Sequence, residues 1–229
     1  MTGPPYPDSD GPEILTALEV RQGGDGLLQR VLAPATRGLL TVEAAEQAPA
    51  LMTCARDATR HGGLVLLLTA ANGWRLDVAN LVVTAAERLW PALYSRRDTL
   101  RLALHEAWVN ALMHGCLRVP PNLRDTPEGW IEHSRTIDAA LADPARGDRP
   151  VLLTLTAETD GWVARVMDQG PGFDAPADVI LGPAVPAQAK TATRGRGLTL
   201  ILGACDRVSW HDGGREIRMM FAYPPREEF

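Results

Sequence analysis

The sequence predicts an α/β fold in which helices pack against a mixed, mostly antiparallel sheet, and three patterns support this. Residues 100–115 carry apolar side chains three and four positions apart, which is typical of a helix with one buried face. Residues 151–167 read as two strands around an Asp-Gly turn, a strong hairpin signal. Residues 207–222 read as a second hairpin around Asp-Gly-Gly. A helix followed by two hairpins favours a sheet that is covered by helices.

Composition sets the broad class of protein. The chain has 229 residues, of which 45% are hydrophobic and 22% charged, so it is long and apolar enough to bury a core. Its formal net charge of -5 disfavours a primary role on DNA or RNA. We therefore expect a globular protein whose partners are small molecules or other proteins.

Cysteine usage and the chain termini bear on location. The three cysteines, Cys54, Cys116 and Cys205, are scattered and lack CxxC spacing, which favours reduced thiols over a zinc site or disulfides. The first residues carry no basic and apolar signal pattern, and no apolar run reaches the ~18 residues of a membrane span. We expect a cytoplasmic protein that contacts no membrane.

Three regions are predicted along the chain. Residues 1–13 form a flexible tail, and residues 14–75 form a small α/β segment of unknown role. Residues 76–229 form the main domain, which carries an insertion at 116–150. The segment 14–75 reads most simply as a structural or partner-docking appendage.

Local patterns give the elements of these regions. The N-terminal segment should contain a strand at 37–42, a helix at 43–61 and a buried strand at 64–68. Asp77 is placed to cap a helix that ends near Pro91, because its side chain can accept from a free backbone N–H. The insertion should contain a helix at residues 128–141, with His133 as a surface or packing residue.

Two polar side chains stand out on the helix at 100–115. Glu106 and Asn110 are four residues apart, so they share one face beside the apolar stripe. Asp98 could cap the start of this helix and Gly115 could close its end. Polar pairs of this spacing are common on solvated helices, so a pocket at this position needs support from other segments.

The first supporting segment follows the strand that ends at Met167. Asp168 stands at the strand end, and Gly170, Gly172 and Phe173 belong to the loop after it. Glycine lets a backbone approach a flat ligand closely, although the same residues also suit a plain turn.

The second supporting segment precedes an apolar helix at 198–204. Gly195 and Gly197 would leave backbone N–H groups free at the positive end of this helix, which is a cradle for phosphate. Lys190, Arg194 and Arg196 form a cationic cluster nearby, for phosphate contact or for solubility. The Ala-, Pro- and Gly-rich stretch at 174–193 would be a flexible lid over the ligand.

In their order along the chain, these three segments resemble the N, G1 and G2 boxes of the GHKL ATPases, which include gyrase B and the histidine kinases. The motifs E-A-x-x-N-A-x-x-H-G and D-x-G-P-G-F are the most specific part of the resemblance, which covers roughly residues 76–223. Within the superfamily, the sequence looks most like the bacterial anti-sigma factor serine/threonine kinases and their histidine kinase-like ATPase relatives.

The resemblance implies a Bergerat-type two-layer sandwich with helices on one face of the sheet, which binds Mg-ATP between them. It implies Asn110 as a Mg²⁺ ligand, Glu106 as the catalytic base and Asp168 as the acceptor of the adenine amine. The ATP-binding set that it implies is Asn110, His114, Asp168, Gly170, Gly172, Phe173, Lys190, Thr193, Arg194, Gly195, Arg196, Gly197 and Leu198.

The leading functional expectation is a regulatory protein serine/threonine kinase that switches between a sigma factor and an anti-anti-sigma antagonist. Three alternatives stay open: a histidine kinase-like ATPase or phosphotransfer protein of a two-component system, a nucleotide-dependent binding module, and a scaffold that no longer binds ATP. Another signalling protein could replace the sigma factor as partner, and a homodimer is also open. Some relatives carry a receiver domain before the ATPase, but residues 14–75 are too few for a complete one.

Overall fold

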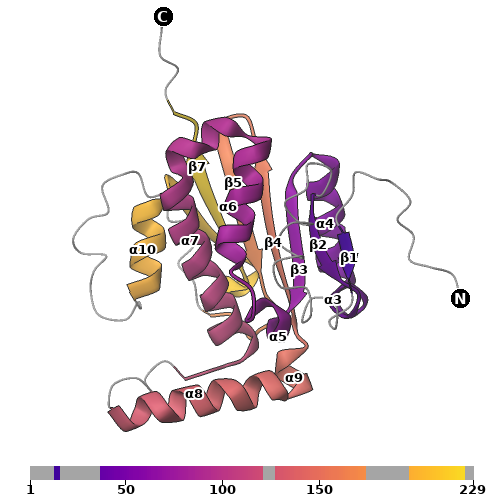
Figure 1. Ribbon diagram of the computed structural model, residues 1–229, viewed down its shortest axis with the longest axis vertical. Coiled ribbons are helices and arrows are strands. Elements are labelled where there is room, and N and C mark those ends of the chain that lie inside the picture. Colours follow the sequence, from indigo (N-terminus) through magenta and orange to yellow (C-terminus); the bar gives the residue numbers. More distant parts are fainter. Residues whose placement is uncertain (1–12, 16–36, 121–126, 174–195, 225–229) are drawn as a thin grey trace, which may run out of the picture.

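A computed structural model describes residues 13–15, 37–120, 127–173 and 196–224 of the chain. Within them, seven strands form one sheet in the order β1-β2-β3-β4-β5-β7-β6 (Figure 1). The strands are β1 (Glu13–Leu15), β2 (Gly38–Thr41), β3 (Leu64–Thr69), β4 (Pro150–Ala157), β5 (Gly161–Met167), β6 (Arg207–His211) and β7 (Glu216–Ala222).

The sheet is mixed, as the sequence predicts. Strands β1, β2 and β3 run parallel to one another, whereas β3, β4, β5, β7 and β6 pair antiparallel in that order. Both predicted hairpins are present, as β4–β5 and β6–β7. Because β3 pairs directly with β4, the N-terminal segment and the main domain share one sheet.

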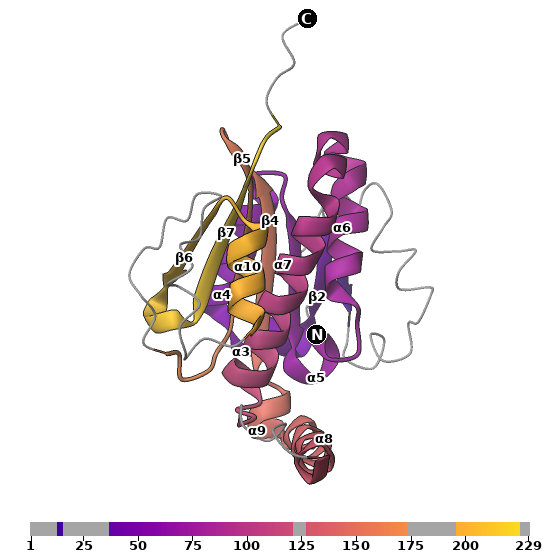
Figure 2. The ribbon, with the colours of Figure 1, turned by 90° about the vertical axis from the view of Figure 1, so that its left-hand side faces the viewer.

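Three helices cover one face of the sheet: α6 (Val78–Leu89), α7 (Arg97–Asn110) and α10 (Arg196–Ala204). Figure 2 shows α10 and α7 side by side in front of the strands. Leu66 and Leu68 of β3 point into this core, together with Leu104 of α7. The predicted α/β (α+β) sandwich with helices on one face is therefore confirmed for the main domain.

A second helical layer lies on the opposite face, over β2, β3 and β4. It consists of α3 (Val42–Gln47) and α4 (Pro49–Arg60), which pack against Val65 and Leu67 of β3. The single helix predicted for residues 43–61 is wrong, because Pro49 divides it. Proline lacks an N–H and its ring obstructs the preceding turn, so it begins α4 instead of lying inside one longer helix.

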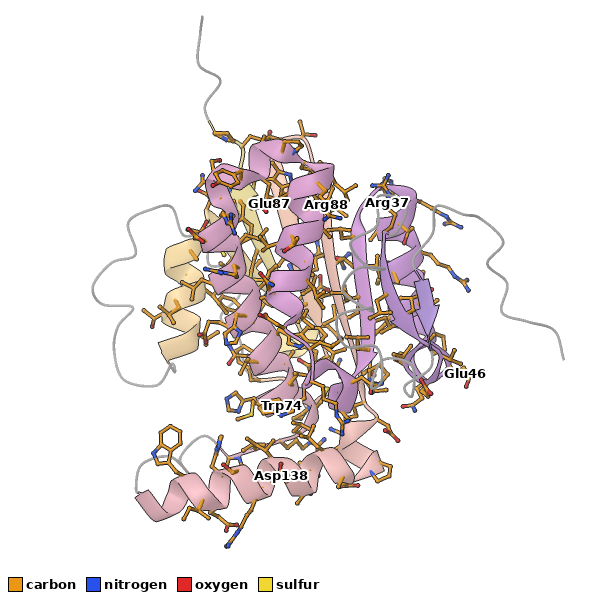
Figure 3. The ribbon with its side chains drawn as sticks, viewed as in Figure 1. Arg37, Glu46, Trp74, Glu87, Arg88 and Asp138 are labelled. Atoms are coloured by element: carbon orange, nitrogen blue, oxygen red, sulfur yellow. The ribbon has the colours of Figure 1, made fainter. Side chains whose placement is uncertain are left out.

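Helix α6 begins as predicted and is tied to the start of α7. The Asp77 side chain accepts a hydrogen bond from the backbone N–H of Asn80 at 3.2 Å. Glu87 lies near the end of α6 that is farthest from α8 (Figure 3), and its Oε1 is 3.4 Å from Nε of Arg97. This ion pair links the two helices across the short η1 helix (Pro91–Arg96).

Both predicted ends of the helix at 100–115 are wrong. Asp98 lies inside the first turn of α7 instead of capping it, because the helix already begins at Arg97. Gly115 does not close the helix, because the chain continues from Asn110 into a π-helical turn, η2 (Ala111–Cys116). Of the predicted site residues, this wider turn carries His114, and its Gly115 lies against Asp168, the residue after β5.

The insertion contains the predicted helix as α8 (Pro127–Ala142), followed by the short α9 (Pro144–Gly147). His133 is a packing residue with 8% of its surface exposed. Arg146 of α9 donates to the carbonyl oxygen of Leu117 at 3.3 Å, and Arg149, which follows α9, donates to that of Cys116 at 3.4 Å. The insertion thus supplies partners for the end of η2. Among the described helices, none has the length and apolar character needed to cross a membrane.

Candidate functional site

A cavity of about 480 Å³ lies between α7, the start of α10 and the ends of β5 and β7. The predicted site residues that line it are Asn110, His114, Asp168, Gly172, Phe173, Gly197 and Leu198. A second cavity of about 430 Å³ beside Trp74 contains none of the predicted site residues. The first cavity is therefore the candidate site.

Asp168 follows the last residue of β5 and stands at one end of this cavity. Its backbone N–H donates to the carbonyl of Arg215 at 3.0 Å, and its Oδ1 accepts from the N–H of Gly170 at 2.7 Å. Burial raises the pKa of the Asp168 carboxyl to about 6, although the Gly170 N–H and the charge of Arg215 favour ionisation. A perturbed carboxylate in a cavity is typical of a functional site.

The loop after β5 is in backbone contact with the end of η2. A Cβ atom at Gly115 would lie 2.4 Å from Cγ of Asp168, and one at Gly170 would lie 2.3 Å from the carbonyl oxygen of Gly115. Neither position has room for a side chain. Gly170 does not line the cavity, but it sets how closely the loop after Asp168 approaches η2.

The same loop also rests on the turn between β6 and β7. Gly172 has a φ of 73°, in the left-handed region that favours glycine, and a Cβ there would lie 2.1 Å from the carbonyl oxygen of Gly213. The N–H of Phe173 donates to that carbonyl at 2.9 Å. The Phe173 ring packs on Gly214 and stays 47% exposed at the mouth of the cavity.

Glu106 and Asn110 face the first turn of α10. A Cβ atom at Gly197 would lie 2.6 Å from Oε2 of Glu106 and 3.5 Å from Nδ2 of Asn110. Asn110 lines the cavity, whereas Glu106 lies outside its wall, one helical turn away. Glycine at 197 leaves the space between α10 and this polar pair open.

His114 lines the cavity from η2. Its ring Nδ1 lies 3.3 Å from the carbonyl oxygen of Val119, a contact in which the ring nitrogen must carry the proton.

Several predicted residues lie outside the described part of the chain. They are Lys190, Thr193, Arg194 and Gly195, together with the proposed lid at 174–193. Arg196 begins α10, but its side chain is also outside the description.

The structure adds cavity residues that the sequence analysis missed. They come mainly from the β6–β7 hairpin: Trp210, Gly214, Arg215 and Ile217. Arg215 is held by Asp212, with Nη2 to Oδ1 at 2.6 Å and Nε to Oδ2 at 3.1 Å. No local signal in the sequence marks Arg215, because it lies beside Asp168 only through the pairing of β5 with β7, which sets Met167 opposite Glu216.

The residues present fit a nucleotide. The volume falls within the ~300–1,000 Å³ of small-molecule pockets, the carboxylate at one end can accept from a base, and α10 presents a helix N-terminus at the other. The described residues hold no group of three His, Cys, Asp or Glu that could bind a metal alone. Magnesium held through phosphate oxygens needs only one or two protein ligands, and Asn110 and Glu106 offer oxygen atoms there.

The fold is therefore a mixed sheet covered by helices, with a cavity of nucleotide size between them. Over residues 68–221, more than half of the chain, the sequence matches the family described as the histidine kinase-like ATPase domain. The chain belongs to this family of ATP-binding domains. No curated protein and no solved structure gave a significant match.

Proposed function

We propose that this protein is a Mg-ATP-dependent protein serine/threonine kinase with a regulatory role. The observation that carries the proposal is the position of Glu106. Its carboxylate lies beside the first turn of α10. On α7, Glu106 is one turn before Asn110, and it lies outside the wall of the cavity that would hold the adenine. A carboxylate that lies beside the expected phosphate position, and not beside the adenine, is suited to act as a general base.

The proposal gives each end of the site one task. Asp168 accepts from the adenine amine, and the N–H groups at the start of α10 donate to phosphate oxygens. Magnesium, held by Asn110 and the phosphates, would offset the charge on the transferred group. An acceptor hydroxyl then forms a bond to the γ-phosphorus, the bond from that phosphorus to the leaving ADP oxygen breaks, and Glu106 takes the hydroxyl proton.

The resemblance to anti-sigma factor kinases supports a role in partner switching. On this proposal, the protein binds a sigma factor or another signalling protein, and an antagonist protein carries the hydroxyl that is phosphorylated. His133 does not suit a phosphoacceptor within the chain, because only 8% of its surface is exposed.

Transfer of labelled phosphate tests this proposal. The purified protein is incubated with Mg²⁺ and ATP labelled at the γ-phosphate in a lysate of its own cells. We expect acid-stable label on serine or threonine of a second protein, and loss of that label with Glu106→Gln. Acid-labile label on histidine would favour the two-component alternative, and ATP binding without any transfer would favour a binding module.

A further inference from the structure

Arg215 carries a charge in the cavity that neither the family resemblance nor the proposed reaction uses. Arg215 is the residue just before β7, and its side chain lines the cavity. Its Cγ would lie 3.3 Å from a Cβ at Gly172, so its aliphatic stem packs along the loop that follows Asp168. The side chain is 42% exposed, and the guanidinium can therefore reorient.

Two carboxylates compete for this guanidinium. The carbonyl of Arg215 accepts from the N–H of Asp168, so the two residues are adjacent across neighbouring strands. In the described residues, however, Arg215 forms its ion pair with Asp212, through two side-chain contacts at 2.6 and 3.1 Å, and none with Asp168. Bidentate pairing of arginine with a carboxylate is the stronger geometry.

As a consequence, no ion pair with the Asp168 carboxylate forms within the described part of the chain. The pKa of Asp168 is raised to about 6, as expected of a buried carboxyl whose charge is not neutralised by contact. Such a carboxylate can accept a hydrogen bond from an exocyclic amine of a base. If Arg215 paired with Asp168, that acceptor would be occupied, and the cavity would present N–H donors instead.

We propose that Asp212 is a specificity-determining residue, which holds Arg215 away from Asp168 and so keeps the cavity selective for adenine. This inference rests on the proposed binding of ATP. Released from Asp212, the guanidinium would pair with Asp168 or donate to a base acceptor. Arginine donates well to O6 and N7 of guanine, whereas adenine carries an amine at the position of O6.

The test compares the affinities for Mg-ATP and Mg-GTP by calorimetry in the full chain and in Asp212→Asn. Asp212 has a φ of 50°, and asparagine adopts this left-handed backbone readily, so the substitution removes the charge without straining the turn. We expect the ratio of ATP to GTP affinity to fall about tenfold, in the lower part of the range that a base-edge contact supplies.

Two further variants separate release of Arg215 from other effects. Asp212→Asn combined with Arg215→Ala should restore most of the preference for ATP, because no guanidinium remains to enter the cavity. Asp160→Asn, in the turn at the other end of β5, is the matched control and should leave the ratio unchanged. A thermal melt of each variant verifies that the fold is retained.

The outcomes distinguish this inference from the function on which it rests. A parent protein that prefers ATP, together with an Asp212→Asn variant of unchanged ratio, overturns the inference alone. A double variant that stays unselective also overturns it, because the loss would then not act through Arg215. A parent protein that binds neither nucleotide, or both equally, overturns the proposed ATP site and this inference with it.

Discussion

Glu106 and Asn110 lie on consecutive turns of α7. We therefore expect their substitutions to affect different steps, phosphate transfer for Glu106 and ATP binding for Asn110. Glu106→Gln keeps the shape of the side chain but removes the base, so phosphate transfer should fall by about 10²–10⁴-fold while ATP still binds. Asn110→Ala removes a polar side chain that lines the cavity and is the proposed Mg²⁺ ligand, so binding itself should weaken in the presence of Mg²⁺. Calorimetry and labelled-phosphate transfer on both variants measure the two effects.

The matched control for this pair is His105→Gln, on the exposed face of the same helix. It should change neither quantity, because His105 does not line the candidate cavity. Transfer by Glu106→Gln at the rate of the parent protein would remove Glu106 from the mechanism.

Asp168 should make nucleotide binding depend on pH. Burial raises its pKa to about 6, against ~3.9 in an unfolded chain, so the carboxyl gains a proton as the pH falls through 6. The ionised form is the better acceptor for the adenine amine, and affinity for adenosine should therefore fall between pH 7 and pH 5. Calorimetry at pH 6 in two buffers of different ionisation enthalpy should show proton release on binding.

The same shift has a defined sign for stability. Because the pKa is higher in the folded than in the unfolded state, the folded state binds the proton more tightly between about pH 4 and pH 6. The contribution of Asp168 to the free energy of unfolding is present below that window and is lost as the pH rises through it.

Asp168→Asn is the control for the pH dependence of binding. This variant should abolish the pH dependence of adenosine binding, and an unchanged pH profile would assign that dependence to another group.

At the scale of elements, the loop after β5 should tolerate no side chain where it meets η2. In Gly170→Ala, the new methyl would lie 2.3 Å from a backbone oxygen of Gly115, so the loop must move. We expect a lower melting temperature, since overpacking costs ~1–3 kcal/mol, and weaker ATP binding, because the displaced loop adjoins Asp168.

Gly203→Ala provides the control for this substitution. A Cβ at Gly203 meets no atom within 4 Å, and alanine favours a helix over glycine by up to ~1 kcal/mol. This variant should keep its affinity for ATP and melt no lower than the parent protein. If Gly170→Ala behaves in the same way, the loop is not held as the structure indicates.

The elements that could be predicted are those whose signals are local. The hairpin turns, the Asp77 cap and the loop after Asp168 are each specified by a few adjacent residues, and each lies where the sequence indicated. Arg215 was missed because it reaches the cavity only through the pairing of β5 with β7, a contact between distant parts of the chain. The π-helical turn at η2 could not be predicted, because Gly115 signals the end of a helix without specifying a wider turn before it.

At the scale of the whole molecule, β3 joins the N-terminal helices to the sheet that carries the site. Leu67 of β3 is fully buried between α4 and the sheet. Leu67→Ala should lower the free energy of unfolding by ~2–5 kcal/mol, the usual cost of such a cavity. Leu102→Ala, on a side chain that is 38% exposed, should cost far less. Denaturant unfolding followed by circular dichroism compares them, and equal effects would contradict the burial of Leu67 beneath α4.

Titration of the intact protein with Mg-ATP and Mg-GTP by calorimetry tests whether Asp168 recognises adenine. We predict a clear preference for ATP in the parent protein. We also predict a marked loss of ATP affinity in Asp168→Asn, because the amide can present a donor where the adenine amine needs an acceptor. Equal affinity of the parent protein for the two nucleotides, or full ATP affinity in Asp168→Asn, would contradict adenine recognition at Asp168.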